Sequence, residues 1–599
     1  MKLKKAITKT LSLLTKPEKA RLLVSVFIQA VLSAADILGI VLMGALGSLG
    51  FNYLAGFELP NWLENFLILL HLEGLSISSL IFLTSVLIAF LFITKSILSL
   101  IISNKIFRFL ALMRARVSSE MSKKSSNAPY VWIKKQDSQK IIFAITDGTN
   151  SLIIGFLGNL ITILSELILL VFIIVTLLVI NPIMTVLSVL LFGGIGLIVF
   201  KLSNSFAERM GRELSEASIA SRNSLSSIFL GYKELHTLQK IELFQNKFLG
   251  SQQINSVASA SAIWLQQLPK VSAEIGLVIG ASALAAYQIW RNDASSGIGV
   301  LLVFLAASSR LLPSLMRTQA ATLSVKNYMA ASRIAFEVIE ELDELEVVMP
   351  QQSQKNNQVP VRIELIGVNF SYSDGTSPAL NNLNLQIEPG SIVAFAGSSG
   401  SGKTTLVDLL LGIYKPNSGD INITDHSGKL INPSIGYVPQ SPYFFPGTIM
   451  ENLTLFDSVD EIDNEHLNKV IADIQLESVI LKLPNGFQTD IGQVGSRLSG
   501  GERQRLAIAR ALYPKPNLLI IDEGTSALDG QMESAITNIL LNFRGEVTVV
   551  LIAHRLASIK NVDDIYYLSN GGILGHGTFQ ELQEILPEFK KQVSFMKLD

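Results

Sequence analysis

A glycine-rich run, Gly397-Ser-Ser-Gly-Ser-Gly-Lys-Thr-Thr405, has the residue types needed to hold phosphate. The apolar residues 392–396 predict a strand before it, and residues 403–411 predict a helix after it. Glycines let backbone N–H groups converge on an anion at a helix N-terminus, Lys403 adds a cation, and the Thr404 hydroxyl can hold Mg2+. An ordinary glycine-rich turn is the alternative, but the strand, loop and helix order favours a nucleotide site. The candidate phosphate-binding residues are Gly397, Ser398, Ser399, Gly400, Ser401, Gly402, Lys403, Thr404 and Thr405.

A second candidate element is Asn517-Leu-Leu-Ile-Ile-Asp-Glu523. Its consecutive apolar residues predict a strand that is buried on both faces, and two carboxylates stand at its end. In phosphoryl transfer, Asp522 would hold Mg2+ and Glu523 would polarise the attacking water. The alternative is a pair of solvated carboxylates at the end of a strand, which the phosphate loop makes a weaker interpretation.

The run Leu498-Ser-Gly-Gly-Glu-Arg-Gln-Arg505 is a further phosphate-facing element. Together with the phosphate loop, it resembles the signature of the ATP-binding cassette (ABC) proteins. The resemblance implies that Ser499, Gly500 and Gly501 contact ATP held by the opposite cassette. It therefore implies ATP and Mg2+ as ligands, ATP hydrolysis as the activity, and a dimer as the working form.

Other site residues follow from the same resemblance. Tyr372 matches the aromatic residue that stacks on adenine, although alone it could equally be a strand tyrosine. Gln440 matches the residue that touches Mg2+ and faces the membrane domain. Asp529 matches a loop that communicates across the dimer, and His554 matches the catalytic switch histidine that senses the terminal phosphate.

Three residues depart from the family pattern. Glu502 stands where these exporters usually have Gln, Gly524 stands where Ala is usual, and Gln493 replaces a usual Glu. None of the three removes a catalytic group. We expect them to tune the rate of hydrolysis or its coupling to the membrane domain.

The composition indicates a membrane protein with more than one domain. The chain has 599 residues, 49% of them hydrophobic, and a mean hydropathy of +0.42, which is too apolar for a wholly soluble enzyme. The net charge of −1 argues against a nucleic-acid partner. The absence of cysteine from the sequence excludes disulfides and thiolate metal sites.

Six stretches are long and apolar enough to cross a bilayer. We expect these helices near 22–46, 78–102, 156–180, 183–201, 268–290 and 297–317, with Asn181-Pro182 as a tight turn between the third and fourth. The predicted fold is therefore multidomain, with an all-α six-helix transmembrane domain followed by an α/β P-loop NTPase (ABC ATPase) domain.

The distribution of basic residues predicts the orientation. Residues 1–21 and the connection 103–150 are rich in Lys and Arg, whereas residues 47–77 have neither. This asymmetry predicts a multi-pass protein of the cytoplasmic membrane whose N-terminus and ATPase domain lie in the cytoplasm. Helical spacing of apolar residues in 61–70 predicts an external helix on the membrane surface.

The predicted domains follow the change in pattern along the chain. They are a cytoplasmic segment 1–21, a transmembrane domain 22–320, a helical extension and linker 321–360, and a nucleotide-binding domain 361–599. The linker is a Gln/Asn-rich run between two prolines, and the alternation of strands and helices after it predicts a substantially parallel sheet. The sequence shows no internal repeat, so a second copy, as in a homodimer, would supply the second cassette.

Ionisable residues within the predicted spans are candidate substrate contacts, because burying charge in a bilayer is costly. Lys95, Arg310 and Arg317 fall in or near the inner leaflet and could line a positive cavity for an anionic head group. The alternative is internal ion pairing with the acidic residues of the same region. The remaining ionisable residues of the spans are Asp36, Glu166, Lys270 and Glu274.

The architecture resembles the six-span ABC exporters, which implies coupling helices near 127–133 and 229–235 that press on the cassettes. Within that family it is similar to PglK-type lipid-linked oligosaccharide flippases in the external helix, the Arg310-Leu-Leu-Pro-Ser314 stretch and the Gly231-Tyr-Lys-Glu234 loop. This likeness implies flipping of a lipid-linked oligosaccharide or related anionic glycolipid. The alternatives are a multidrug, lipid or peptide exporter, and, in another class, an ATP-switched channel or membrane regulator.

Overall fold

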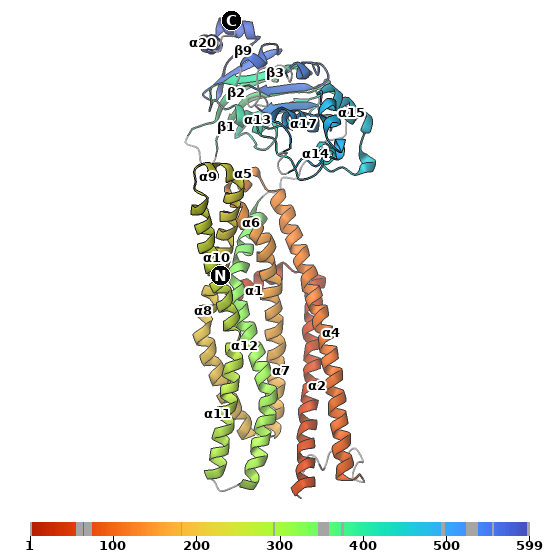
Figure 1. Ribbon diagram of the computed structural model, residues 1–599, viewed down its shortest axis with the longest axis vertical. Coiled ribbons are helices and arrows are strands. Elements are labelled where there is room, and N and C mark those ends of the chain that lie inside the picture. The colour runs from red at the N-terminus through yellow and green to blue at the C-terminus, as the bar shows by residue number, and fades with distance from the viewer. Residues whose placement is uncertain are drawn as a thin grey trace. The chain divides into compact units, whose positions relative to one another are not determined.

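The chain divides into two compact units, Met1–Val348 and Met349–Asp599. The computed structural model describes residues 3–55, 64, 75–180, 182–290, 294–345, 359–372, 377–492, 497–522, 537–553 and 556–595. The first unit is helical and the second combines helices with two β-sheets (Figure 1). The predicted linker and the predicted external helix lie largely outside the described residues.

The first unit consists of long helices joined by short ones. In chain order they are α1 (Leu3–Ser12), α2 (Lys16–Ala55), α4 (Ile77–Ser126), α5 (Tyr130–Lys135), α6 (Ser138–Phe143), the π-helical segments η1 (Ala144–Gly148) and η2 (Ser151–Leu157), α7 (Gly158–Ile180), α8 (Pro182–Leu230), α9 (Tyr232–Thr237), α10 (Ile241–Leu265), α11 (Leu268–Trp290) and α12 (Ala294–Glu344). Each predicted span lies within one of the long helices or, for 156–180, within η2 and α7.

Helix α4 continues well past the second predicted span, through much of what the sequence suggested was a charged connection. The reason is a stripe of buried side chains three or four residues apart, which keeps one face of the helix in the core while the charges lie outside. The stripe consists of Ile106, Leu110, Met113, Val117 and Met121.

Helix α8 begins at Pro182, where a helix has no need of the N–H that proline lacks. Since α7 ends at Ile180, the predicted turn falls between α7 and α8, with Asn181 itself outside the described residues. With 49 residues, α8 is roughly 70 Å long, more than twice a hydrocarbon core of about 30 Å. It extends far beyond the predicted span 183–201.

Among the described residues, three helical segments are long and apolar enough to cross a membrane. They are Ile77–Ser126, Ser138–Leu178 and Thr185–Leu230. The other predicted spans lie within α2, α11 and α12 and stay predictions.

The second unit contains two sheets. A six-stranded sheet has the order β5-β6-β7-β3-β8-β9, parallel except for β9, which confirms the predicted α/β domain with a mostly parallel sheet. A separate antiparallel sheet has the order β2-β1-β4 and was not anticipated from the sequence. The strands are β1 (Arg362–Phe370), β2 (Leu380–Ile387), β3 (Ile392–Gly397), β4 (Ser418–Thr424), β5 (Ile435–Val438), β6 (Leu518–Asp522), β7 (Thr548–Ile552), β8 (Asp564–Ser569) and β9 (Gly572–Gly577).

Helices pack on the six-stranded sheet over one continuous apolar core. The helices are α13 (Lys403–Leu410), α14 (Ile449–Thr454), α15 (Asn464–Asp473), α16 (Glu477–Lys482), α17 (Gly500–Leu512), α19 (Phe579–Ile585) and α20 (Pro587–Phe595), with 3-10 turns at Val459–Glu461, Gly486–Gln488 and Leu556–Ile559.

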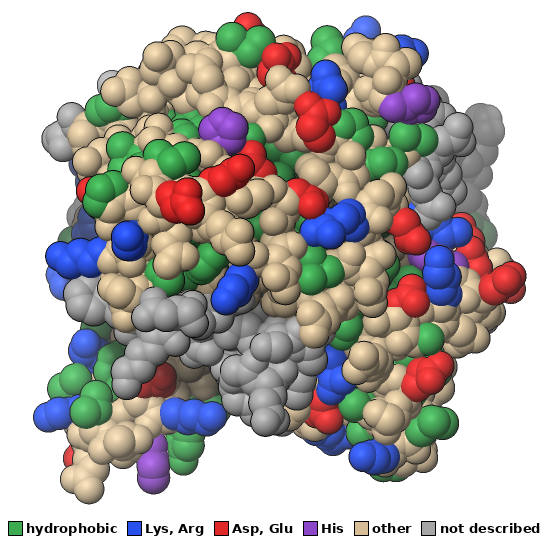
Figure 2. All heavy atoms as spheres, turned by 90° about the horizontal axis from the view of Figure 1, so that it is seen from above, with side chains coloured by type: hydrophobic (Ala, Val, Ile, Leu, Met, Phe, Trp, Pro, Cys, Tyr) green, Lys and Arg blue, Asp and Glu red, His purple; other side chains and the backbone are tan. Residues whose placement is uncertain are grey.

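On the face drawn in Figure 2, acidic and basic side chains are interspersed. Neighbouring charges of opposite sign therefore limit the electrostatic field above that face.

Candidate functional site

The phosphate loop joins β3 to α13, as predicted. Gly397, Gly400 and Gly402 have φ of +142°, +80° and +104°, a region that side chains disfavour. A Cβ on Gly397 would lie 2.2 Å from the carbonyl oxygen of Leu568, so β8 passes too close for any other residue. Glycine is required here by both conformation and space.

Lys403 is held inside the loop. Its ammonium donates hydrogen bonds of 2.8 Å to the carbonyl oxygens of Gly397 and Ser398, and the residue is only 5% exposed. No side chain caps the N-terminus of α13, whose first N–H groups border the same loop. A buried cation beside these N–H groups is the arrangement that binds phosphate.

The loop also contains a buried polar atom that no described group satisfies. The hydroxyl of Ser401 is buried without a hydrogen-bond partner in the described part of the chain. Buried hydroxyls are normally bonded, so this one fits a site that a ligand oxygen completes. Ser398, Ser399, Gly400 and Thr404 are exposed on the same loop.

Candidate Mg2+ ligands gather at one edge of the six-stranded sheet. Strands β5, β6, β7 and β3 are parallel, and their registers place Asp522 level with Ile552, and Ile552 level with Phe395. Gln440 follows β5 by two residues and is exposed at the same edge. Thr404, Gln440 and Asp522 supply oxygen atoms, the donors that Mg2+ prefers, so the residues present fit a magnesium ion that also binds phosphate.

Three predicted site residues lie outside the described residues. Glu523 directly follows the last residue of β6, His554 follows β7 by two residues, and Asp529 belongs to the same undescribed stretch as Glu523. Their roles stay predictions. Gln493 and Gly524, two of the departures from the family pattern, also lie outside the described part.

Tyr372 is bound to the phosphate-loop helix, a connection that the sequence did not reveal. Its hydroxyl lies 2.9 Å from that of Thr405, which is buried. Its ring contacts Phe370 and Tyr414 edge-on, at centroid distances of 5.1 and 5.6 Å, and the residue is 37% exposed. The exposed part of the ring leaves surface on which a base can stack.

The signature forms the N-terminus of α17. Ser499 caps the helix by accepting a 3.3 Å hydrogen bond from the Glu502 N–H, and the Glu502 carboxylate accepts a 2.8 Å bond from the Ser499 N–H. Ser499 and Gly500 are exposed and Gly501 is buried. The Ser-Gly-Gly-Glu spacing is a capping-box pattern that could have been read from the sequence. Gln would keep both bonds, so what Glu502 adds is a negative charge.

The three candidate substrate contacts have different surroundings. Arg317 is engaged by Glu166 through two hydrogen bonds, Nε to Oε1 at 2.5 Å and Nη2 to Oε2 at 3.1 Å, and the Ser314 hydroxyl donates to the same carboxylate at 2.7 Å. For Arg317 the structure thus favours the ion-pair alternative. Lys95 is partly buried and also contacts other groups. The side chain of Arg310 lies outside the description.

The two predicted coupling segments contain short helices. Segment 127–133 leads into α5 and segment 229–235 leads into α9. Both helices lie at the same end of the helical unit (Figure 1). Exposed apolar side chains surround α9, including Leu230 at 88% and Tyr232 at 51%.

The phosphate loop, the capped signature helix and the mostly parallel sheet together define a P-loop ATPase domain of the ABC type. Residues 380–526 match the family described as ABC transporter. The match contains the phosphate loop, Asp522, Glu523 and the signature.

Known proteins of similar sequence match part of the chain. The chain is similar to an ATP-dependent lipid A-core flippase of Saccharophagus degradans, with 33% identity over 395 residues, 65% of this chain and 65% of that protein. It is also similar to ABC transporter B family member 29, chloroplastic, of Arabidopsis thaliana, with 36% identity over 41% of this chain and 40% of that protein. The aligned parts thus span less than two thirds of the length of these relatives.

A solved structure shows the fold of both units. A bacterial Atm1-family ABC exporter with ATP bound matches 97% of this chain and 99% of its own chain, with a TM-score of 0.76 and 19% identity. The fold is therefore that of an ABC exporter, with a helical transmembrane region followed by an ABC ATPase domain. The predicted fold class is confirmed.

Proposed function

We propose that this protein is an ATP-driven flippase or exporter that acts as a homodimer in the cytoplasmic membrane. The observation that carries the proposal is one chain with a phosphate loop around a buried Lys403 and an exposed signature at Ser499. A second copy would bring its signature to the ATP of the first. The names of the similar flippase and exporter agree with this assignment.

ATP hydrolysis would use the phosphate loop, the residues at the sheet edge and Glu523, which directly follows β6 in the sequence. The N–H groups of the loop and Lys403 would hold the phosphates, with Ser401 completing the cradle. Glu523 would take a proton from water as the water oxygen attacks the γ-phosphorus and the bond to the bridging oxygen breaks, which yields ADP and phosphate. Mg2+ held by Thr404, Gln440 and Asp522 would supply positive charge to the phosphates.

We infer that the substrate is amphipathic, and that a lipid-linked oligosaccharide or related anionic glycolipid suits the chain best. Lys95 and Arg310 lie on helices of the transmembrane region, where cations are costly unless they have a role. The likeness to PglK-type flippases and the name of the lipid A-core flippase support a lipid substrate.

A multidrug, lipid or peptide exporter is the second candidate, and one observation favours it. Glu166 engages Arg317, which reduces the positive charge available to an anionic head group. In this case hydrophobic drugs should stimulate ATP hydrolysis, and removing the charge of Lys95 or Arg310 should have little effect.

The test is a flipping assay in proteoliposomes. A fluorescent polyprenyl-diphosphate oligosaccharide is placed in the membrane, and the fraction that becomes protected from an external quencher is followed after ATP addition. The proposal expects ATP-dependent flipping by the wild type and none by Glu523→Gln. Drug-stimulated hydrolysis without glycolipid flipping would support the second candidate instead.

A further inference from the structure

The last turns of α12 carry five carboxylates. We call four of them the α12 acidic cluster: Glu337, Glu340, Glu341 and Asp343. Each is engaged by a donor from another element of the helical unit. Lys140 of α6 pairs with Glu337, Lys9 of α1 with Glu340, Lys124 of α4 with Asp343, and two side chains at α5 bond to Glu341. The cluster lies immediately before the segment that leads to the ATPase unit.

Glu341 differs from the other members of the cluster. Its Oε2 accepts hydrogen bonds from Trp132 Nε1 at 3.1 Å and from Gln136 Nε2 at 2.8 Å, and all three side chains are partly buried. By contrast, the side chains of Lys124 and Asp343 are 47% and 50% exposed. Hydrogen bonds to a partly buried carboxylate contribute more to the free energy of unfolding than an exposed ion pair does.

Both donors to Glu341 belong to the predicted coupling helix. Trp132 lies within α5, and Gln136 is the residue that ends it. The Trp132 ring also packs against the apolar core of the helical unit. On the remaining surface, Tyr130 and Ile133 are 44% and 40% exposed. Helix α5 therefore has one side fixed to its own chain, while other side chains of the helix stay partly exposed.

The other predicted coupling helix is not fixed in this way. Within the described part of the chain, no hydrogen bond or ion pair joins α9 to α12, and the one side-chain bond of α9 runs from Thr237 to Lys233 within the helix. Helix α9 packs on α8 and α10. Of the two predicted coupling helices, α5 is thus the one that the described contacts attach to α12.

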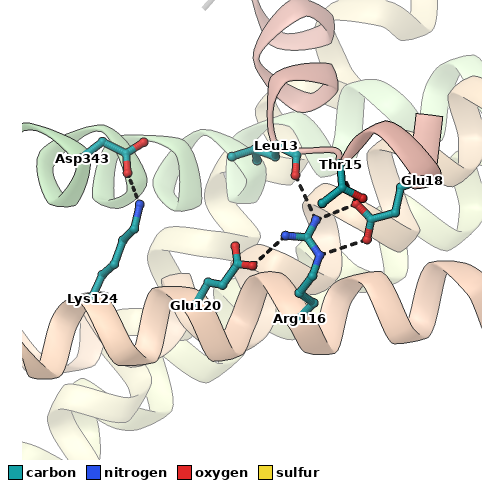
Figure 3. A network of polar contacts seen from close by, with 7 residues as sticks. All are labelled: Leu13, Thr15, Glu18, Arg116, Glu120, Lys124 and Asp343. Carbon is teal, nitrogen blue, oxygen red and sulfur yellow. Dashed lines mark hydrogen bonds and ion pairs between the residues drawn. The ribbon is translucent and has the colours of Figure 1, made fainter.

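Polar contacts of α4 stabilise the region around the α12 acidic cluster. Arg116 of α4 donates to the Leu13 carbonyl oxygen at 2.9 Å and to Glu18 at 2.7 and 2.9 Å, while Lys124 of the same helix reaches Asp343 of α12 (Figure 3). Helix α4 is therefore tied both to α12 and to the segment between α1 and α2. The end of α12 is held by several neighbours, so a movement of α5 has a firm structure to act on.

We propose that Glu341 is a positioning residue that makes α5 and the end of α12 move as one body. This inference rests on the proposed ATP-driven transport. The resemblance to ABC exporters implies two routes from the ATPase unit to the membrane helices: the chain that follows α12, and the coupling helix α5. Glu341 joins the two routes, so each cassette movement reaches α12 and α5 together. Without the hydrogen bonds to Glu341, ATP hydrolysis continues, but the membrane helices follow the movement of the cassette only in part.

The first experiment measures flipped lipid per ATP hydrolysed in proteoliposomes, with a fluorescent polyprenyl-diphosphate oligosaccharide as the probe. Glu341→Leu, which removes the acceptor, should reduce this ratio about tenfold while basal hydrolysis stays near wild type. Glu341→Gln keeps an acceptor oxygen and should restore much of the ratio. Asp343→Asn, two positions away in an exposed ion pair, should match wild type. An unchanged ratio in Glu341→Leu would overturn the inference.

The second experiment uses the absence of cysteine from the sequence. A Gln136→Cys, Glu341→Cys double variant should be poorly coupled, and joining the two thiols with a short bifunctional reagent should restore flipping, because one body tolerates an internal link. A link that stops flipping would show that α5 and α12 separate during the cycle and would refute the proposal. If the wild type itself flips no lipid, the proposed function fails instead, and that outcome is visible before any variant is made.

Discussion

The ion pair between Arg317 and Glu166 decides whether this arginine serves the structure or the substrate. The Glu166 side chain is 13% exposed and that of Arg317 is 52% exposed. Removing one partner of a fully buried pair costs about 3–5 kcal/mol, and the exposure of Arg317 reduces this value by solvent screening. We therefore expect Arg317→Met, which leaves Glu166 in its buried position with Ser314 alone, to cost about 2 kcal/mol.

The opposite substitution should cost less. Glu166→Gln leaves the half-exposed Arg317 in contact with water and keeps an acceptor for Ser314, so we expect about 1 kcal/mol. If the two residues act as a pair, the double variant should be no less stable than Arg317→Met, instead of showing the sum of the two losses. The coupling would then be about 1 kcal/mol or more.

The assay is thermal unfolding of the full-length protein in nanodiscs, combined with the flipping assay on the same four proteins. Stability losses that simply add would refute the pairing. If the stability losses do not add but the double variant cannot flip an anionic lipid, Arg317 also contacts the substrate. Non-additive losses together with normal flipping would remove Arg317 from the substrate site.

Three further predictions concern the ATPase unit. Glu523→Gln should retain ATP binding while hydrolysis stops and the dimer is trapped closed, and near-normal hydrolysis would remove Glu523 from its role. Ser499→Ala should destabilise α17 by about 1 kcal/mol and weaken ATP-dependent dimerisation. Glu502→Gln keeps both capping bonds and should strengthen dimerisation, because it removes a negative charge near the phosphates of the ATP bound to the second copy. Equal dimerisation of wild type and Glu502→Gln would contradict this. The pKa of His466 is lowered by burial and by the nearby Lys515. The unfolded chain therefore binds a proton at this histidine near pH 6.5, whereas the folded chain binds it only at lower pH. Stability should therefore be full above that pH and decline as the pH falls, and His466→Phe should flatten the decline in a thermal unfolding series; an unaltered slope would exclude His466 as its cause.

The phosphate loop was predictable because its chemistry is local. Glycines, a lysine and a threonine that follow one another on a strand, turn and helix must lie together wherever that segment folds. The capping box at Ser499 and Glu502 was equally local, although the pattern was read only as a phosphate-facing element. The parallel sheet then accounts for Asp522, which ends β6, and Gln440, which follows β5, since the ends of these strands share one edge.

The lengths of the helices were harder to predict. The hydrophobic spans indicated where helices cross the bilayer, but charged residues after them suggested long connections. The buried stripe from Ile106 to Met121 shows that α4 continues, because an amphipathic helix can leave the membrane without ending. The sequence signal for the longer helix was the spacing of these apolar residues at three or four positions, which the charged residues between them made hard to see.

The sequence by itself determined the class of protein through its nucleotide-binding motifs and its apolar helical region, and it predicts a second copy. These features depend on neighbouring residues or on average composition. Only the tertiary structure decided that Arg317 meets Glu166, that Tyr372 bonds to Thr405, and that α5 is fixed to α12 through Glu341. Such contacts join residues far apart in the chain, and their geometry depends on the rotation and register of packed elements, which no local pattern specifies.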